Sequence, residues 1–177
     1  MDSINSRIGR TLISAEEISD AVKKAGAEIS AEYDGKPLLL VSILKGAFVF
    51  LSDLCREITI PCEIEFITAS SYYSGTSSSG EVKITSGLTR DISGHHVIIV
   101  EDIIDSGRTL SAVAEIIRKM SPLSLKIVTL LDKPERREVD LKADCSLFTI
   151  PDHFVIGYGL DLDEHYRNLP YIAEYKE

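Results

Sequence analysis

Residues Val97–Leu110 read VIIVEDIIDSGRTL, and this stretch decides the fold. It opens with Val97–Val100, which is wholly apolar, as in a short strand buried on both faces. After a turn of small residues, apolar side chains recur at helical spacing and predict a helix from Ser106 to Met120. The stretch therefore predicts a buried strand and a helix, with carboxylates and a hydroxyl-bearing turn between them.

Buried strands alternate with helices along the rest of the chain. Further segments interpreted as strands are Leu38–Leu44, which is almost continuously apolar, Ile64–Thr68, Leu125–Leu131 and Phe154–Tyr158. Helical patterns begin at Ser14, which has the spacing of a capping box with Glu17, and at Ala47, where the pattern extends to Glu57. This alternation predicts an α/β fold with a central, mainly parallel twisted sheet flanked by helices.

Length and composition limit the classes of function. A chain of 177 residues predicts a single domain, residues 1–177. Its 19 Lys and Arg against 28 Asp and Glu give a net charge of −9, which disfavours generic binding to nucleic acid or anionic membranes. The cysteines lack metal-ligand or disulfide spacing. Because the sequence shows neither a signal peptide nor a membrane span, we expect a cytoplasmic protein.

Residues 70–80 read SSYYSGTSSSG and break the alternation of strands and helices. So small and polar a segment cannot bury enough surface to order itself, which predicts a flexible loop. Residues 81–89 resume an alternating pattern, so the loop is expected to join two antiparallel strands. The segment is either a hairpin tip that tolerates disorder or a lid over a site.

The turn Ser106–Thr109 lies where the predicted helix begins. Backbone N–H groups, Gly107, two hydroxyls and the positive end of the helix dipole would together form a cradle for a phosphate monoester. Glu101 and Asp102 precede the turn at the carboxyl edge of the strand, where carboxylates could accept hydrogen bonds from vicinal hydroxyls. The combination indicates a phosphorylated sugar, and the alternative is an acidic helix entry that only complements the dipole.

The same stretch resembles the donor-binding motif of type I phosphoribosyltransferases, and its EDIIDSGRTL form is similar to that of the hypoxanthine-guanine branch. The resemblance implies that Glu101 and Asp102 hold the ribose hydroxyls and help to bind a metal ion. Asp105 would lie near N7 of the purine and manage its proton as a general acid and base. The loop implied to bind the 5′-phosphate is Asp105, Ser106, Gly107, Arg108 and Thr109.

Two lysine-containing segments extend the resemblance. Ser42–Phe50, SILKGAFVF, resembles the family's pyrophosphate loop, which implies pyrophosphate binding by Leu44, Lys45 and Gly46 and a cis peptide before the lysine. Lys133, in LLDKPE, corresponds to a lysine that donates to the purine 6-oxo group and so selects oxopurines over adenine. Without the resemblance, each lysine would be interpreted as an ordinary solvated residue.

Residues 150–170 resemble the purine-binding segment of the family, which lies in a small hood beside the main sheet. The resemblance implies that Phe154 stacks on the base and that the backbone of Val155 reads the base edge. Asp161 corresponds to an acid that helps to hold Mg²⁺, and Arg167 to an arginine that contacts pyrophosphate. Taken alone, a phenylalanine in a short apolar run would be interpreted as core.

The loop at residues 70–80 also gains a role from the resemblance. Ser71 and Tyr72 would close over the reacting centre, because water would otherwise capture the ribosyl group. The resemblance therefore favours the lid over the tolerant hairpin tip.

For the whole chain, the resemblance implies a purine salvage enzyme that works with Mg²⁺. It would transfer 5-phosphoribosyl from 5-phosphoribosyl 1-pyrophosphate (PRPP) to N9 of hypoxanthine and guanine, giving IMP, GMP and pyrophosphate. A homodimer or homotetramer is implied as well. The alternatives are a pyrimidine-operon attenuator that binds RNA and has uracil phosphoribosyltransferase activity, and an inactive phosphosugar-binding protein. The acidic composition argues against RNA, since the only dense basic run is Lys133–Arg137.

Overall fold

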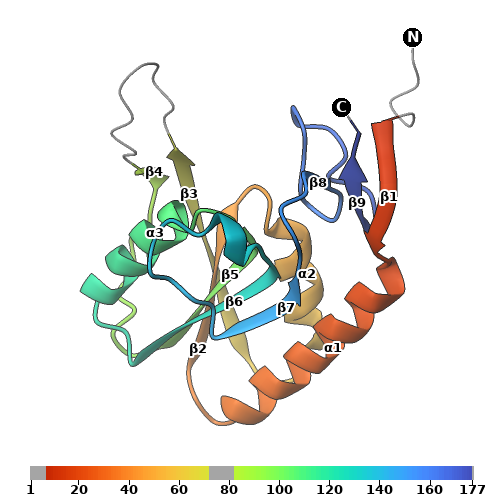
Figure 1. The fold of residues 1–177 in the computed structure, drawn as a ribbon. Coiled ribbons are helices and arrows are strands. Elements are labelled where there is room, and N and C mark those ends of the chain that lie inside the picture. Colours follow the sequence, from red (N-terminus) through yellow and green to blue (C-terminus); the bar gives the residue numbers. More distant parts are fainter. Residues whose placement is uncertain (1–6, 72–81, 177) are drawn as a thin grey trace.

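Figure 1 shows the computed structural model of the chain, which describes residues 7–71 and 82–176. In these residues a six-stranded sheet is flanked by helices, and a three-stranded sheet lies beside it. The strands of the larger sheet are, in spatial order, β4 (Val82–Ser86), β3 (Cys62–Ser71), β2 (Leu38–Leu44), β5 (His96–Ile104), β6 (Ser124–Asp132) and β7 (Cys145–Thr149). Only β4 is antiparallel to its neighbour, so the predicted mainly parallel sheet is confirmed.

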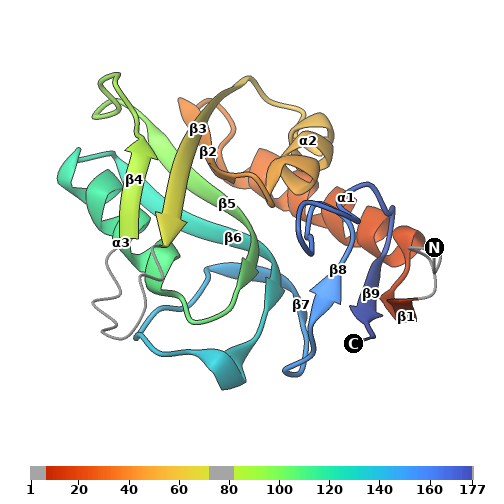
Figure 2. The ribbon, with the colours of Figure 1, turned by 90° about the horizontal axis from the view of Figure 1, so that it is seen from above.

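Helices cover both faces of the larger sheet (Figures 1 and 2). α1 (Ala15–Glu32) and α2 (Phe48–Glu57) pack on one face, and α3 (Arg108–Lys119) packs on the other. α1 begins at the predicted capping box, in which the Ser14 side chain accepts from the backbone of Glu17 and the Glu17 carboxylate accepts from the backbone of Ser14. The predicted arrangement of helices around a central sheet is therefore confirmed.

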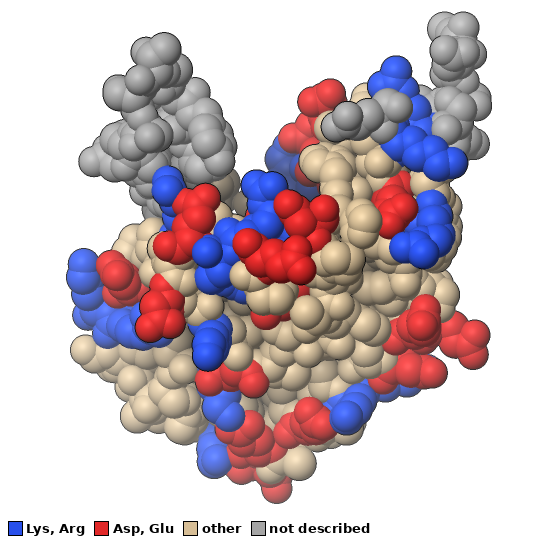
Figure 3. Space-filling view, viewed as in Figure 1, with Lys and Arg blue, Asp and Glu red and all other residues tan. Residues whose placement is uncertain are grey.

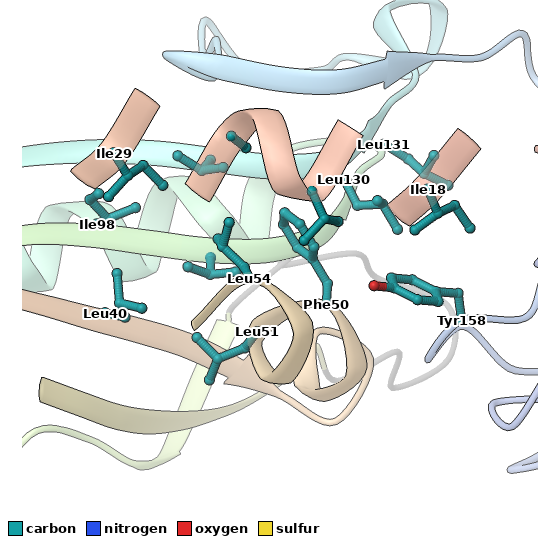
Figure 4. Packing of buried hydrophobic residues seen from close by; sticks show 14 of the residues in the cluster. Ile18, Ile29, Leu40, Phe50, Leu51, Leu54, Ile98, Leu130, Leu131 and Tyr158 are labelled. Carbon is teal, nitrogen blue, oxygen red and sulfur yellow. The ribbon is translucent and has the colours of Figure 1, made fainter. Parts of the chain in front are cut away.

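Figure 4 shows the core between α1, α2 and the sheet. The cluster includes Ile18 of α1, Phe50 and Leu54 of α2, and Leu40 and Ile98 from the neighbouring strands β2 and β5, and all five side chains are buried. Burial of one such side chain contributes about 1.5 to 3 kcal/mol. This packing fixes the strands on whose carboxyl ends the predicted site residues lie.

The smaller sheet contains β1 (Ile8–Ile13), β9 (Ile172–Tyr175) and β8 (Val155–Ile156), in that order and antiparallel. We call these strands and residues 157–170 the hood. The hood is tied to α2 because the Tyr158 hydroxyl donates to the Asp53 carboxylate at 2.6 Å. Figure 4 shows the Tyr158 ring pointing toward the core beside α2.

Several predicted strand boundaries were wrong, including those of Ile64–Thr68, where β3 extends from Cys62 to Ser71. β5 does not stop at Val100 but continues to Ile104. The acid pair, Glu101 and Asp102, therefore belongs to the strand itself. The predicted strand Phe154–Tyr158 is only Val155–Ile156, because Gly157 turns the chain with a φ of +102°. It also pairs within the hood rather than with the central sheet.

The predicted hairpin is present, since β3 and β4 pair in antiparallel fashion. Ser71 is the last residue of β3. Tyr72 and the rest of the predicted flexible loop lie outside the described residues, so the lid stays a prediction.

Cys55, Cys62 and Cys145 carry free thiols. Within the described ranges, none of the helices combines the length and the apolar character needed to cross a membrane. The single domain over residues 1–177 stays a prediction.

Candidate active site

The predicted sugar-phosphate residues line one pocket of about 230 Å³ at the carboxyl edge of the central sheet. Its walls come from the end of β2, the end of β5 and the turn into α3. The predicted site residues in its lining are Leu44, Gly46, Glu101, Asp102, Asp105, Ser106, Gly107 and Thr109. The structure therefore brings the predicted pyrophosphate loop and the predicted phosphate cradle to the same pocket.

The acid pair lies on β5 against the pyrophosphate loop. Glu101 is half-buried, and its Oε2 has no hydrogen-bond partner among the described residues. Asp102 is buried, its Oδ1 accepts from the backbone N–H of Ile103 at 2.7 Å, and its Oδ2 fills the space of a Cβ on Gly46. Burial, and then the charge of Asp102, raises the pKa of Glu101 well above 4.5, and burial raises the pKa of Asp102 to about 6.

These raised pKa values predict that the free energy of unfolding falls as pH rises. Between pH 3.8 and about 6, the folded chain keeps a proton on Asp102 that the unfolded chain has released, so stability declines across this range. Glu101 acts with the same sign. Glu101→Gln is expected to be more stable than the parent protein by on the order of 1 to 3 kcal/mol at about pH 8, and nearly equal in stability at about pH 4.

Urea unfolding of the protein and the variant at both pH values measures this difference. Glu115→Gln, on an exposed position of α3, is the matched control and should show no gain that depends on pH. A Glu101→Gln protein with no advantage at the higher pH would contradict the cost of burying this charge.

The turn into α3 has the backbone geometry of an anion cradle. Gly107 is the N-cap residue with a φ of +80°, and its position leaves the start of the helix without a side-chain cap. Glycine is favoured there because the conformation is costly for other residues. The side chain of Arg108 pairs with Glu138 at 2.5 Å, and Arg108 does not line the pocket, so this side chain does not contribute to the cradle.

Asp105 lines the pocket and forms an ion pair with Arg136, which lies in the short 3₁₀ helix η2 (Pro134–Arg136). The Oδ1 and Nε atoms are 2.8 Å apart, and Arg136 also lies 3.6 Å from Asp152. Arg136 was not predicted as a site residue. It belongs to the basic run noted in the sequence, but nothing in a turn arginine identifies its partner.

The predicted base-binding residues differ in their exposure to solvent. Lys133 follows β6, is only 7% exposed, and its backbone N–H donates to the Ile104 carbonyl at 3.0 Å. It is therefore no ordinary solvated lysine. Phe154 is 52% exposed, with its ring at the edge of Tyr175, so it is not a core residue, whereas Val155 is buried.

Three predicted residues of the pyrophosphate and metal region are brought together by a residue that was not predicted. Lys45 Nζ lies 2.8 Å from Glu164 Oε1, and Arg167 Nη2 lies 3.1 Å from Oε2 of the same carboxylate. Arg167 also pairs with Asp161 at 2.9 Å and donates to the Gly159 carbonyl at 2.8 Å. Glu164 was missed because one acid in an acidic chain gives no signal.

The hood rests directly on the predicted pyrophosphate loop. The Leu44–Lys45 peptide is cis, as the resemblance implied. Gly159 has a φ of +100°, and a Cβ at this position would lie 2.1 Å from the carbonyl oxygen of Gly46. The position of the loop is therefore set by the hood as well as by β2 and α2.

Comparisons with known proteins agree with this geometry. The model of the phosphoribosyl transferase domain family matches residues 12–164. A hypoxanthine-guanine phosphoribosyltransferase of Streptococcus pneumoniae is 49% identical over 170 residues, which cover 96% of this chain and 94% of that protein. The enzyme of the same name from Bacillus subtilis is 50% identical over 169 residues, with 96% and 94% covered.

The fold agrees as well. A crystal structure of a hypoxanthine phosphoribosyltransferase from Staphylococcus aureus matches 99% of this chain and 96% of its own with a TM-score of 0.93, at 45% sequence identity. Since the family model spans most of the chain and these relatives match nearly all of it, the chain belongs to the phosphoribosyltransferase family.

Proposed function

We propose that this protein transfers the 5-phosphoribosyl group of PRPP to N9 of hypoxanthine and guanine in purine salvage, giving IMP, GMP and pyrophosphate. The observation that carries the proposal is the pocket of about 230 Å³ that both the acid pair and the phosphate cradle line. The names of the relatives from S. pneumoniae, B. subtilis and S. aureus support the same substrate class.

The ribose 5-phosphate would be held from two sides. Backbone N–H groups at the start of α3 and the hydroxyls of Ser106 and Thr109 bind the phosphate, with the helix dipole favouring its charge. Glu101 and Asp102 accept hydrogen bonds from the ribose hydroxyls. Holding the sugar at both ends aligns C1′ with the incoming base and removes much of the entropic cost of the reaction.

Asp105 would act on the proton of the base. When N9 forms its bond to C1′, the bond from C1′ to the pyrophosphate oxygen breaks, and the purine must lose a proton. In our proposal the Asp105 carboxylate accepts that proton at N7. The ion pair with Arg136 supports this role, since it holds the carboxylate at the pocket before the base arrives.

The negative charge of departing pyrophosphate would be stabilised by Lys45, by Arg167 and by backbone groups of the loop Leu44–Gly46. The acid pair also fits Mg²⁺, because Glu101 Oε2 has no hydrogen-bond partner among the described residues and carboxylate oxygens are hard ligands that this ion prefers. Mg²⁺ suits such a site, because it usually binds only one or two carboxylates and completes its coordination with water and substrate oxygens. Glu101, Asp102 and Asp161 would hold it, and it would neutralise phosphate charge.

The base would be selected by Lys133 and Phe154. The ammonium group of the buried residue Lys133 can donate to a 6-oxo group but opposes an exocyclic amine, so adenine is disfavoured. The exposed ring of Phe154 offers a face for stacking, and the buried Val155 presents backbone groups.

The RNA-binding alternative is not favoured. Lys133 of the basic run is buried, Arg136 pairs with Asp105, and Arg137 pairs with Asp132. On the face in Figure 3, Lys and Arg lie interspersed with Asp and Glu rather than gathered in one basic patch. An RNA backbone would meet no continuous positive surface there.

A panel of bases tests the proposed function. With PRPP and Mg²⁺, hypoxanthine and guanine should be converted, and adenine should react at least about 10³-fold more slowly because it lacks the acceptor for Lys133. Xanthine and uracil complete the comparison, followed by product chromatography. Turnover of uracil without turnover of hypoxanthine would favour the attenuator instead. Gel filtration with light scattering tests the predicted homodimer or homotetramer.

A further inference from the structure

The carboxylate of Glu164 bridges the two cations that the proposed function assigns to pyrophosphate. Its Oε1 lies 2.8 Å from Lys45, and its Oε2 accepts from Arg167 at 3.1 and 3.3 Å. The two oxygens thus engage two different positive side chains, from the pyrophosphate loop and from the hood. A pyrophosphate group that binds the same two side chains would have to replace these contacts.

The turn that carries Glu164 fixes where its side chain starts but does not bury it. The backbone N–H of Glu164 donates to Asp161 at 2.9 Å, and its φ is +66°, in the left-handed region. The side chain nevertheless remains 61% exposed. It can therefore leave the two cations without breaking any packing in the core.

We propose that Glu164 competes with pyrophosphate for Lys45 and Arg167, weakening the binding of the PRPP pyrophosphate group and speeding the release of the pyrophosphate product. The inference rests on the proposed function, because that function makes these two side chains the pyrophosphate ligands. A glutamate side chain is anionic at neutral pH, so the competing group carries the charge that both cations attract.

The expected effect of Glu164 on pyrophosphate affinity follows from the exposure of its two ion pairs to solvent. Exposed ion pairs are weak, so two of them together should reduce pyrophosphate affinity about 3- to 10-fold. The competition also leaves no unpaired cations when pyrophosphate departs, since the carboxylate re-forms both contacts. Glu164 is thus a positioning residue that acts through Lys45 and Arg167.

Glu164→Gln tests the proposal, because glutamine keeps the size and the backbone but removes the charge. Calorimetric titration with pyrophosphate and Mg²⁺ should give a dissociation constant about 3- to 10-fold lower than that of the parent protein. In steady-state assays, the KM for PRPP should fall, kcat should not rise, and pyrophosphate should inhibit more strongly. Asp163→Asn is the matched control, since it removes one charge from the neighbouring left-handed residue of the same turn.

The control should bind pyrophosphate as the parent protein does. Equal tightening in both variants would show a general charge effect, and weaker binding in Glu164→Gln would show that Glu164 only orders the turn. Either result would overturn the inference. Calorimetry does not depend on turnover, so a parent protein that binds pyrophosphate but converts no purine would contradict the proposed function while still testing Glu164.

Discussion

Asp105→Asn is expected to lower kcat about 10²- to 10⁴-fold while the KM for PRPP stays nearly unchanged. Asparagine preserves the shape of the phosphate turn but cannot accept the proton that the purine loses. The chemical step is therefore affected far more than the binding of the donor. Steady-state kinetics with hypoxanthine, with PRPP varied at saturating base, measure both quantities.

The control for this prediction is Asp152→Asn, which removes the other carboxylate near Arg136 and lies on an exposed position. It should leave kcat close to that of the parent protein, because Asp152 does not line the pocket. A loss of kcat in Asp105→Asn that is matched by an equal rise in KM would point to a damaged phosphate cradle rather than to proton transfer.

Gly159→Ala should lower the free energy of unfolding by about 2 to 5 kcal/mol and raise the KM for PRPP. Two costs add at this position. The φ of +100° is unfavourable for any residue with a Cβ, and that Cβ would lie 2.1 Å from the backbone oxygen of Gly46, which is too close. Relief requires the hood to move away from the pyrophosphate loop, so stability and donor binding should suffer together.

Gly35→Ala separates these two costs. Gly35 also has a positive φ, +68°, but a Cβ there would meet no atom within 4 Å. It should lose only the conformational part, about 1 to 2 kcal/mol, with no change in KM. Chemical denaturation and steady-state kinetics of both variants make the comparison. Equal losses in the two variants would mean that the hood does not press on the loop.

The parts of the fold that the sequence predicted well are those determined by local pattern. β2 occupies Leu38–Leu44, as predicted, because an almost continuously apolar run is bounded by Lys36-Pro37 on one side and Lys45-Gly46 on the other. α1 was predicted from its capping box. By contrast, β1 pairs with β9 from the opposite end of the chain, and the short, partly polar sequences of these two strands carry little strand signal.

A similar division holds for the candidate site. The acid pair and the phosphate turn were predicted because they are contiguous in sequence and follow a recognisable strand. Glu164 and Arg136 were not, because their partners Lys45 and Asp105 are distant in sequence, with Glu164 lying 119 positions after Lys45. Ion pairing across the fold is decided by tertiary geometry, which single-residue patterns do not encode.

The charged forms of Glu101 and Asp102 destabilise the folded state, and this affects how the protein can evolve. Because burial disfavours their charged forms, neutral replacements at these positions should be tolerated by folding and opposed only by selection for the proposed activity. A duplicated gene freed from that selection would lose the acids early while keeping the rest of the cleft. Such a descendant would retain a well-folded receptor for phosphorylated compounds with no chemistry of its own.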